Sequence, residues 1–318
     1  MATLDFAPGN TTQRGAWIRD FQLVDGYVHV KSTGVRFKND WQLWKDIGRW
    51  FTYYAFVRLH GLWARLSGTT GPRIYFAPHR PRPWYILWAA TVWGGMRFAS
   101  SPETAHATIY FEDQTKAIPP PPRHARAFNF GVGDVSKSFV ARANERAFGY
   151  RLALDPTTHA GEAVEKSEGN GVHDGRIVQC PTARIEGKAY QRVIKTEGAD
   201  GWAIDLRTAC VDGKPVVVFV KKKPASARFS IQNTSVVVKA PEEVFTSAEL
   251  SQIERFCSEM RLDWGGLDVL REYASGRLYV VDVNKTDTGP AVVLNWKDRA
   301  KATTLLSNAL RDMIAVEG

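Results

Sequence analysis

The chain is poor in cysteine, with only Cys180, Cys210 and Cys257 among its 318 residues. Their isolation excludes a disulfide framework and zinc-finger spacing, and it indicates a protein of a reducing cytosol. Long apolar runs are also missing. No stretch approaches the roughly 18 uncharged apolar residues of a membrane-spanning helix, so we expect none. The opening MATLDFAPGN has no basic segment followed by an apolar run, so we expect no signal peptide.

Acidic residues are outnumbered by basic ones, 33 against 42, which gives a formal net charge of +9. This balance favours an anionic partner such as a nucleotide, an anionic small molecule or an anionic membrane surface. No zinc-finger spacing and no repeated basic–aromatic module accompanies the charge, so we expect no nucleic-acid partner. The chain is otherwise globular in composition and long enough for two or three packed subdomains.

A hairpin is predicted near the C-terminus. Two apolar runs, 267–273 and 278–283, flank Ala274-Ser275-Gly276, which has the composition of a three-residue loop with glycine in the left-handed position. With such a loop, Leu270 faces Val280 and Glu272 faces Leu278. A slip of one residue would turn every side chain to the other face of the sheet.

The same register places Asp268 opposite Asp282. Like charges on directly opposed residues destabilise a sheet, and a cation between them removes that cost. Mg²⁺ fits, because it takes one or two carboxylates, keeps water and completes its octahedron with phosphate oxygens. Asn284 adds an amide oxygen on the same face. The alternative interpretation is an ordinary hairpin with exposed acids.

Residues 1–70 form an aromatic-rich segment that we expect to be helical. On a helical wheel Lys45 and Arg49 lie on one side, and another side carries Trp44, Ile47, Phe51, Tyr54 and Leu62. Two interpretations remain open. Residues 40–66 form an interfacial amphipathic helix at a membrane surface, or they form a pair of core helices with breaks or close contacts at Gly48 and Gly61.

Residues 71–131 read as a small parallel α/β unit. Strands are predicted over 73–77, 96–99 and 107–111, with an apolar helix over 83–93. A second helix is predicted from Asp134 and ends at Gly149.

Lys166 is predicted at the end of a short strand, before Gly169, Gly171 and Gly175. Glycines let backbone N–H groups approach phosphate oxygens, and a neighbouring lysine neutralises their charge. The segment lacks the GK[ST] sequence of a Walker A motif, and a solvated turn explains the same composition.

The remaining C-terminal elements are clear in type. Strands are predicted around 189–195, 203–207, 215–220 and 236–238, with a turn at Asp212-Gly213 and a basic cluster, residues 221–223 with Arg228, ahead of the last strand. A capping box at Thr246 and Glu249 begins a helix, and a final helix covers about 298–314.

The order of these signals resembles that of the ATP-grasp superfamily, most closely its ribosomal-protein glutamate ligase-like branch. The order is a lysine and glycine hairpin, Gln191-x-x-Ile194, Asp205-x-Arg207, a basic turn, then Asp268 and Asp282-x-Asn284. The resemblance covers about residues 125–318. It implies an α+β fold in which a lid subdomain, 132–195, and a metal-binding subdomain, 196–318, clamp ATP. The small domain 71–131 and the helical segment 1–70 precede them.

The resemblance also implies roles for individual residues. Asp282 replaces the family's glutamate, Arg192 its acidic residue after the hinge, and Lys285–Pro290 its run of small residues. The implied ATP contacts are Lys166, Gly169, Gly171, Gly175, Gln191, Val193, Ile194 and Asp205, the Mg²⁺ ligands are Asp268, Asp282 and Asn284, and the residues facing the transferred phosphoryl group are Arg207, Lys222 and Arg228.

These residues predict an ATP- and Mg²⁺-dependent ligase that activates a carboxylate as an acyl phosphate and condenses it with an amine or other nucleophile. One alternative is a phosphotransferase that uses the same site on an anionic or lipid-like acceptor. Another is a membrane-surface adaptor with a non-catalytic nucleotide site. We expect a cytoplasmic protein, with peripheral contact at the inner membrane surface if residues 40–66 bind lipid.

Overall fold

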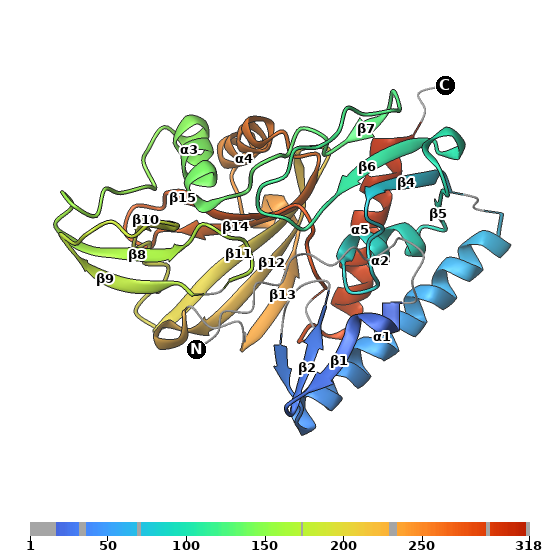
Figure 1. Cartoon of the computed structure of the whole chain (residues 1–318), viewed down its shortest axis with the longest axis horizontal. Helices are drawn as coiled ribbons and strands as arrows, with labels where there is room; N and C mark the ends of the chain where they lie inside the picture. Colours follow the sequence, from blue (N-terminus) through green and yellow to red (C-terminus); the bar gives the residue numbers. More distant parts are fainter. Residues whose placement is uncertain are drawn as a thin grey trace.

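The computed structural model describes residues 17–31, 36–68, 71–172, 174–228, 234–290 and 293–315. These residues form an α+β structure with one five-stranded, one four-stranded and two three-stranded sheets (Figure 1). None of the described helices combines the length and the hydropathy of a membrane span.

The central element is an antiparallel five-stranded sheet in the order β13-β12-β11-β14-β15. A tight turn at Asp212 and Gly213, both with positive φ, joins β11 to β12 as predicted. β12 continues through the basic cluster 221–223, which the sequence had placed in a turn. The strand bounds are β11 Trp202–Val211, β12 Lys214–Pro224, β13 Ser235–Lys239, β14 Trp264–Arg271 and β15 Leu278–Asn284.

Two helices cover one face of this sheet (Figure 1). Helix α3, Lys137–Phe148, ends at Gly149 in the left-handed conformation, as predicted. Helix α4, Ser247–Met260, begins with the predicted capping box. Its fully buried Ile253 and Phe256 pack on apolar residues of the strands, because alternate residues of each strand point to this side.

Helix α5, Trp296–Ile314, packs on the opposite face of the five-stranded sheet and joins it to the small parallel unit. That unit has the strand order β5-β4-β6-β7, all parallel, and helix α2, Ile86–Trp93. The predicted α/β arrangement is therefore confirmed, although α2 begins three residues later than expected. The strands are β4 Arg73–Pro78, β5 Arg97–Phe98, β6 Ala107–Phe111 and β7 Ala127–Phe128.

A separate antiparallel sheet carries the glycine-rich loop. Its order is β10-β8-β9, with bounds β8 Gly161–Ser167, β9 Arg176–Cys180 and β10 Lys188–Arg192. Lys166 lies near the end of β8, as predicted. We call this three-stranded sheet the lid sheet; position 173 of its loop lies outside the described residues.

The hairpin of β14 and β15 has the predicted pairing of Asp268 with Asp282, but the residues between the loop and these aspartates pair differently from the prediction. Leu270 faces Tyr279 and not Val280, because the loop is one residue longer than expected. A bulge between Asp268 and Val269 then shifts the register back by one residue. The two errors in the prediction cancel at the aspartates.

The N-terminal segment differs most from expectation. A small antiparallel sheet, β1 Phe21–Val24, β2 Tyr27–Val30 and β3 Arg36–Lys38, precedes one continuous helix, α1 Trp41–Leu66. Gly48 and Gly61 do not break this helix. A Cβ on Gly61 would lie 2.2 Å from the carbonyl oxygen of Val92, so glycine allows α1 to contact α2 closely. Residues 1–16, 32–35 and 69–70 lie outside the described part.

Candidate functional site

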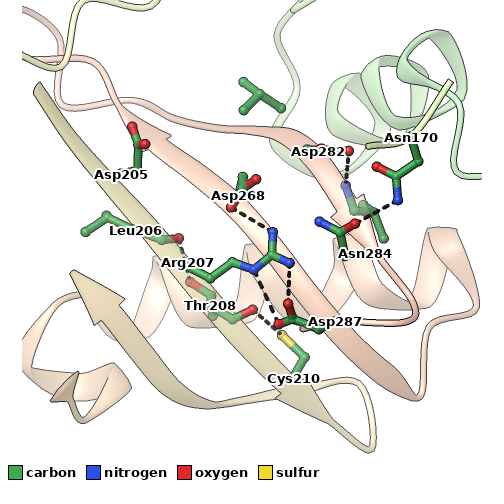
Figure 2. Close-up of polar contacts among 12 residues, drawn as sticks. Asn170, Asp205, Leu206, Arg207, Thr208, Cys210, Asp268, Asp282, Asn284 and Asp287 are labelled. Carbon is green, nitrogen blue, oxygen red and sulfur yellow. Dashed lines mark hydrogen bonds and ion pairs between the residues drawn. The ribbon is translucent and has the colours of Figure 1, made fainter. Parts of the chain in front are cut away.

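Arg207 is the centre of a cluster of buried charges on the sheet face that α3 and α4 do not cover. Its Nη1 donates to Asp268 Oδ1 at 2.8 Å, and its Nη2 donates to Asp287 Oδ1 at 2.5 Å. Figure 2 shows the guanidinium between these two carboxylates. Burial alone would lower the pKa of Arg207, but the two carboxylates raise it above its usual value. Arg207 is therefore a fixed positive charge.

Each of the paired aspartates has a cation as partner. Asp268 accepts a hydrogen bond from Arg207. Asp282 accepts one at 2.5 Å from Nζ of Lys137, the first residue of α3. Burial would raise the pKa of Asp268, but Arg207 and Lys221 hold it below its usual value. The repulsion predicted between the aspartates is thus removed by side chains of the chain itself.

Lys166 reaches the same place from the lid sheet. Its Nζ donates to the carbonyl oxygen of Val281 at 2.9 Å, next to Asp282. Loss of solvation lowers the pKa of Lys166 to about 8, with Asp282 opposing the shift and Lys137 adding to it. The lysine before the glycine loop and the two aspartates are therefore brought together, as predicted.

The glycine-rich loop is held over the cluster by hydrogen bonds. Glu168 accepts from the N–H of Ser138 at 2.9 Å at the start of α3, and the N–H of Asn170 donates to Thr115 at 2.7 Å. Gly171 has φ +73°, a conformation that favours glycine. The Asn170 side chain contacts Lys137 and Asn284, so the loop and the carboxylate strands share one polar network.

Asn284 lies between the loop and Arg207. One end of its amide is 2.7 Å from Asn170, and the other end is 2.8 Å from both Nη atoms of Arg207. Asn170 presents one donor, Nδ2, and Arg207 presents two, so the amide oxygen is assigned to the Arg207 side. That oxygen faces the same centre as the carboxylate of Asp268.

Other predicted residues lie away from the cluster. Asp205 lies further along β11 (Figure 2) and pairs with Lys223 at 2.7 Å. Lys222 is exposed, because strand alternation turns Lys221 and Lys223 toward the charged face instead. Arg228 donates to the carbonyl oxygen of Ile194 and pairs with Glu197 at 3.6 Å, so it contacts residues 191–194, the expected hinge segment.

The hinge segment itself is only partly buried. Gln191 and Ile194 are buried, and Val193 is half-buried. Gln191 Nε2 donates to the carbonyl oxygen of Lys137 at 3.4 Å, which connects the hinge with the first residue of α3.

Sequence reasoning missed three charged residues of this region. Lys137 is 5% exposed at the first turn of α3, where the helix dipole disfavours a cation; this mismatch was the available signal. Asp287 is buried against Arg207. The only sequence signal for it was its position in residues 285–290, where the family has small residues. Lys285 is buried over the ring of Tyr110 at 5.6 Å, and its Nζ has no hydrogen-bond partner among the described residues.

The segment that contains Lys285 joins the charged cluster to the parallel unit. Thr286 donates to Asp113, just past β6, and the carbonyl oxygen of Asp287 accepts from the N–H of Ile86 at 3.0 Å. The carboxyl end of β6 therefore lies beside the cluster, at the edge where open α/β sheets bind ligands.

The oxygen atoms at the centre suit a magnesium ion. Asp268, Asp282 and Asn284 supply two carboxylates and an amide on neighbouring strands, and Mg²⁺ takes its other ligands from water and phosphate. No group of three or more His, Cys, Asp or Glu side chains among the described residues could enclose a metal. The donor set thus fits an ion that arrives with a nucleotide.

No family model and no curated protein matches this sequence. Solved structures similar in shape include the ATP-grasp ligase PsnB with a phosphomimetic precursor variant, Mg and ADP (14% identity, TM-score 0.41). The match covers 60% of this chain and 62% of that one, so the chain spans less than two thirds of PsnB in this comparison.

Two further structures are similar over more of their length. A RimK-domain ATP-grasp protein of Sphaerobacter thermophilus has 11% identity and a TM-score of 0.44, over 76% of this chain and 99% of that one. The D-alanine–D-alanine ligase of Bacillus anthracis with ATP has 10% identity and a TM-score of 0.44, over 76% and 97%. Similarity at this level describes the shape of the chain alone.

Proposed function

We propose that the chain is an ATP- and Mg²⁺-dependent ligase that activates a carboxylate as an acyl phosphate and joins it to an amine or other nucleophile. One observation carries the proposal: Lys166, Lys137 and Arg207 converge on Asp268, Asp282 and Asn284 beneath a glycine-rich loop. Three cations with oxygen ligands at one point suit a polyphosphate and its metal.

The side chains would act by exchanging partners. In the described state Lys137 neutralises Asp282 and Arg207 neutralises Asp268. These carboxylates and Asn284 would hold Mg²⁺, which would neutralise charge on the phosphates of the nucleotide. Lys137, Lys166 and Arg207 are then available to stabilise negative charge on the transferring phosphoryl group. Asp287 keeps the Arg207 guanidinium in place during this change.

The acceptor would bind where the parallel unit meets the cluster. The segment from Asn284 to Asp287 lies between both, and Lys221 adds a cation on the same face of the sheet. An anionic acceptor, such as a carboxylate, suits this surplus of basic side chains. Transfer of the γ-phosphoryl group to the acceptor carboxylate gives ADP and an acyl phosphate, and attack by the nucleophile then releases phosphate.

The proposal is tested by incubating the protein with ATP, Mg²⁺ and fractionated metabolites in the presence of hydroxylamine. A ligase of this class yields a hydroxamate, because hydroxylamine traps acyl phosphates, together with stoichiometric ADP. The phosphotransferase alternative gives ADP and a stable phosphorylated product without hydroxamate. ATP binding without turnover by any fraction would favour the adaptor alternative and contradict both enzymatic ones.

A matched pair of variants checks the site. Asp282→Ala should abolish turnover, whereas Asp298→Ala, at a half-buried position in the first turn of α5 and outside the charged cluster, should leave turnover unchanged. Equal turnover in the wild type and Asp282→Ala would contradict the assignment.

A further inference from the structure

Helix α1 has an exposed apolar face along its whole length. Trp41, Trp44, Gly48, Phe51, Ala55, Leu59, Leu62 and Leu66 follow one another at intervals of three or four residues, so they lie on one side of the helix. Over 26 residues this side extends roughly 38 Å. The large side chains on it and beside it are 52–80% exposed: Trp41, Trp44, Phe51, Leu59, Leu62, Trp63 and Leu66. We call these seven side chains the α1 outer face.

The α1 outer face is not the side that holds the helix to the protein. Tyr53, Val57, Gly61 and Ala64 are buried on the opposite side. There Tyr53 exchanges a hydrogen bond with Thr303 of α5 at 2.6 Å, and His60 stacks on Trp93 of α2 at 3.7 Å. The helix is therefore anchored without its outer face. Ile47 and Tyr54, which the sequence placed with the apolar stripe, are half-buried.

The charges that border the α1 outer face are basic. Lys45, Arg49 and Arg58 are exposed, whereas Asp46, the one acid within α1, is half-buried and lies 3.8 Å from Arg49. Tryptophans lie near both ends of the face, and their rings prefer the boundary between apolar and polar surroundings. Apolar length, terminal tryptophans and a basic border together match an anionic lipid surface.

A second copy of the chain matches less well. Two outer faces packed against each other would bring basic borders together, without an exposed acid in α1 to pair with them. Each chain also carries a net charge of +9, which opposes association of two copies. An anionic surface reverses the sign of this interaction.

We propose that the α1 outer face binds the surface of an anionic lipid membrane, with α1 lying parallel to the bilayer and Lys45, Arg49 and Arg58 at the headgroups. The apolar side chains enter the boundary between headgroups and acyl chains. The inference does not depend on the ligase activity, because no residue of the charged cluster lies in α1.

Flotation of the full chain with vesicles tests this. Binding is expected to vesicles of phosphatidylcholine with phosphatidylglycerol, and not to phosphatidylcholine alone, and it should weaken as salt is raised. Leu62→Glu should reduce binding by roughly tenfold or more, because a charge replaces an apolar side chain that enters the bilayer boundary on binding. Lys45→Gln and Arg58→Gln should each reduce it roughly fivefold.

Ile118→Glu is the matched control, since Ile118 is 97% exposed and lies outside α1; it should bind like the wild type. The far-UV circular dichroism spectrum and melting temperature of every variant show whether the fold is intact. Absence of binding by the wild type, equal binding to neutral vesicles, or unchanged binding by Leu62→Glu would overturn the proposal. A lipid-free dimer that Leu62→Glu dissociates would assign the face to a second copy and overturn it as well.

Discussion

The two faces of the five-stranded sheet are built from alternate residues of the same strands, yet they differ in kind. On the side of α3 and α4, Leu206, Val218, Leu267 and Val269 are packed in an apolar core. On the other side, beyond α5, Arg207 is surrounded by charged groups and held by ion pairs. Apolar packing stabilises the sheet, whereas desolvated charges cost free energy. The first face therefore supports the chemistry proposed for the second.

The substitution with the largest expected effect on the charged face is Arg207→Met. We expect turnover to fall roughly 10³-fold, because a preorganised cation is lost from the phosphoryl site. The free energy of unfolding should also fall by about 3–5 kcal/mol, since Asp268 and Asp287 lose their partner. Steady-state kinetics and denaturant unfolding measure the two effects. Retention of full activity would remove Arg207 from the mechanism.

Phe256→Ala changes the apolar face alone. Phe256 is fully buried between α4 and the sheet, so truncation should lower the free energy of unfolding by about 3–5 kcal/mol. The affinity for ATP, measured calorimetrically at a temperature where the variant is folded, should not change. A large loss of affinity would show that the two faces are not independent.

The pH dependence of the site follows from Lys166. Its pKa of about 8 in the folded chain is lower than the ordinary value of 10.5, so the fold disfavours the ammonium form. The resulting cost to stability is present below about pH 8 and disappears as the pH rises toward 10.5. Lys166→Met lacks this cost. The difference in free energy of unfolding between the variant and the wild type should therefore shrink as the pH rises from about 8 to 10.5.

The same titration affects nucleotide binding. The neutral amine attracts phosphate less, so the affinity of the wild type for ATP should fall above pH 8, by up to about tenfold per unit. Lys166→Arg retains its charge and should show a flat profile. A wild-type profile that is also flat to pH 10 would contradict the pKa of Lys166.

Lys221 and Lys222 give the smallest and most local comparison. Lys221 faces the charged side beside Asp268, whereas Lys222 is exposed on the other side. We expect Lys221→Ala to lower turnover severalfold and Lys222→Ala to change it by less than about twofold, because an exposed charge contributes little. A larger effect from Lys222 would reverse our assignment of the two faces.

Local patterns predicted most of the elements. Alternation and turn residues located β4, β6, β8 and β11, and the capping box and Gly149 located the ends of two helices. The hairpin shows the limit of this reasoning. Its loop length and its bulge depend on packing around β14 and β15, and the correct pairing of the aspartates came from two errors that cancel.

The missed residues share a physical reason. Lys137 and Asp287 are more than 75 residues from the partners Asp282 and Arg207, and no periodicity encodes such contacts. The sequence does not show how far β12 continues, and this length decides which of Lys221, Lys222 and Lys223 faces the charged side. Gly48 and Gly61 were interpreted as breaks or close contacts; Gly61 is a close contact with α2, whereas Gly48 is exposed with no neighbour within 4 Å, and the sequence could not distinguish the two.

The ion pairs within the charged cluster have a consequence for the folding of the chain. Because Lys137 and Arg207 already balance Asp282 and Asp268, we expect the chain to fold without a divalent ion. Chelating agents should stop the proposed reaction while leaving the melting temperature unchanged.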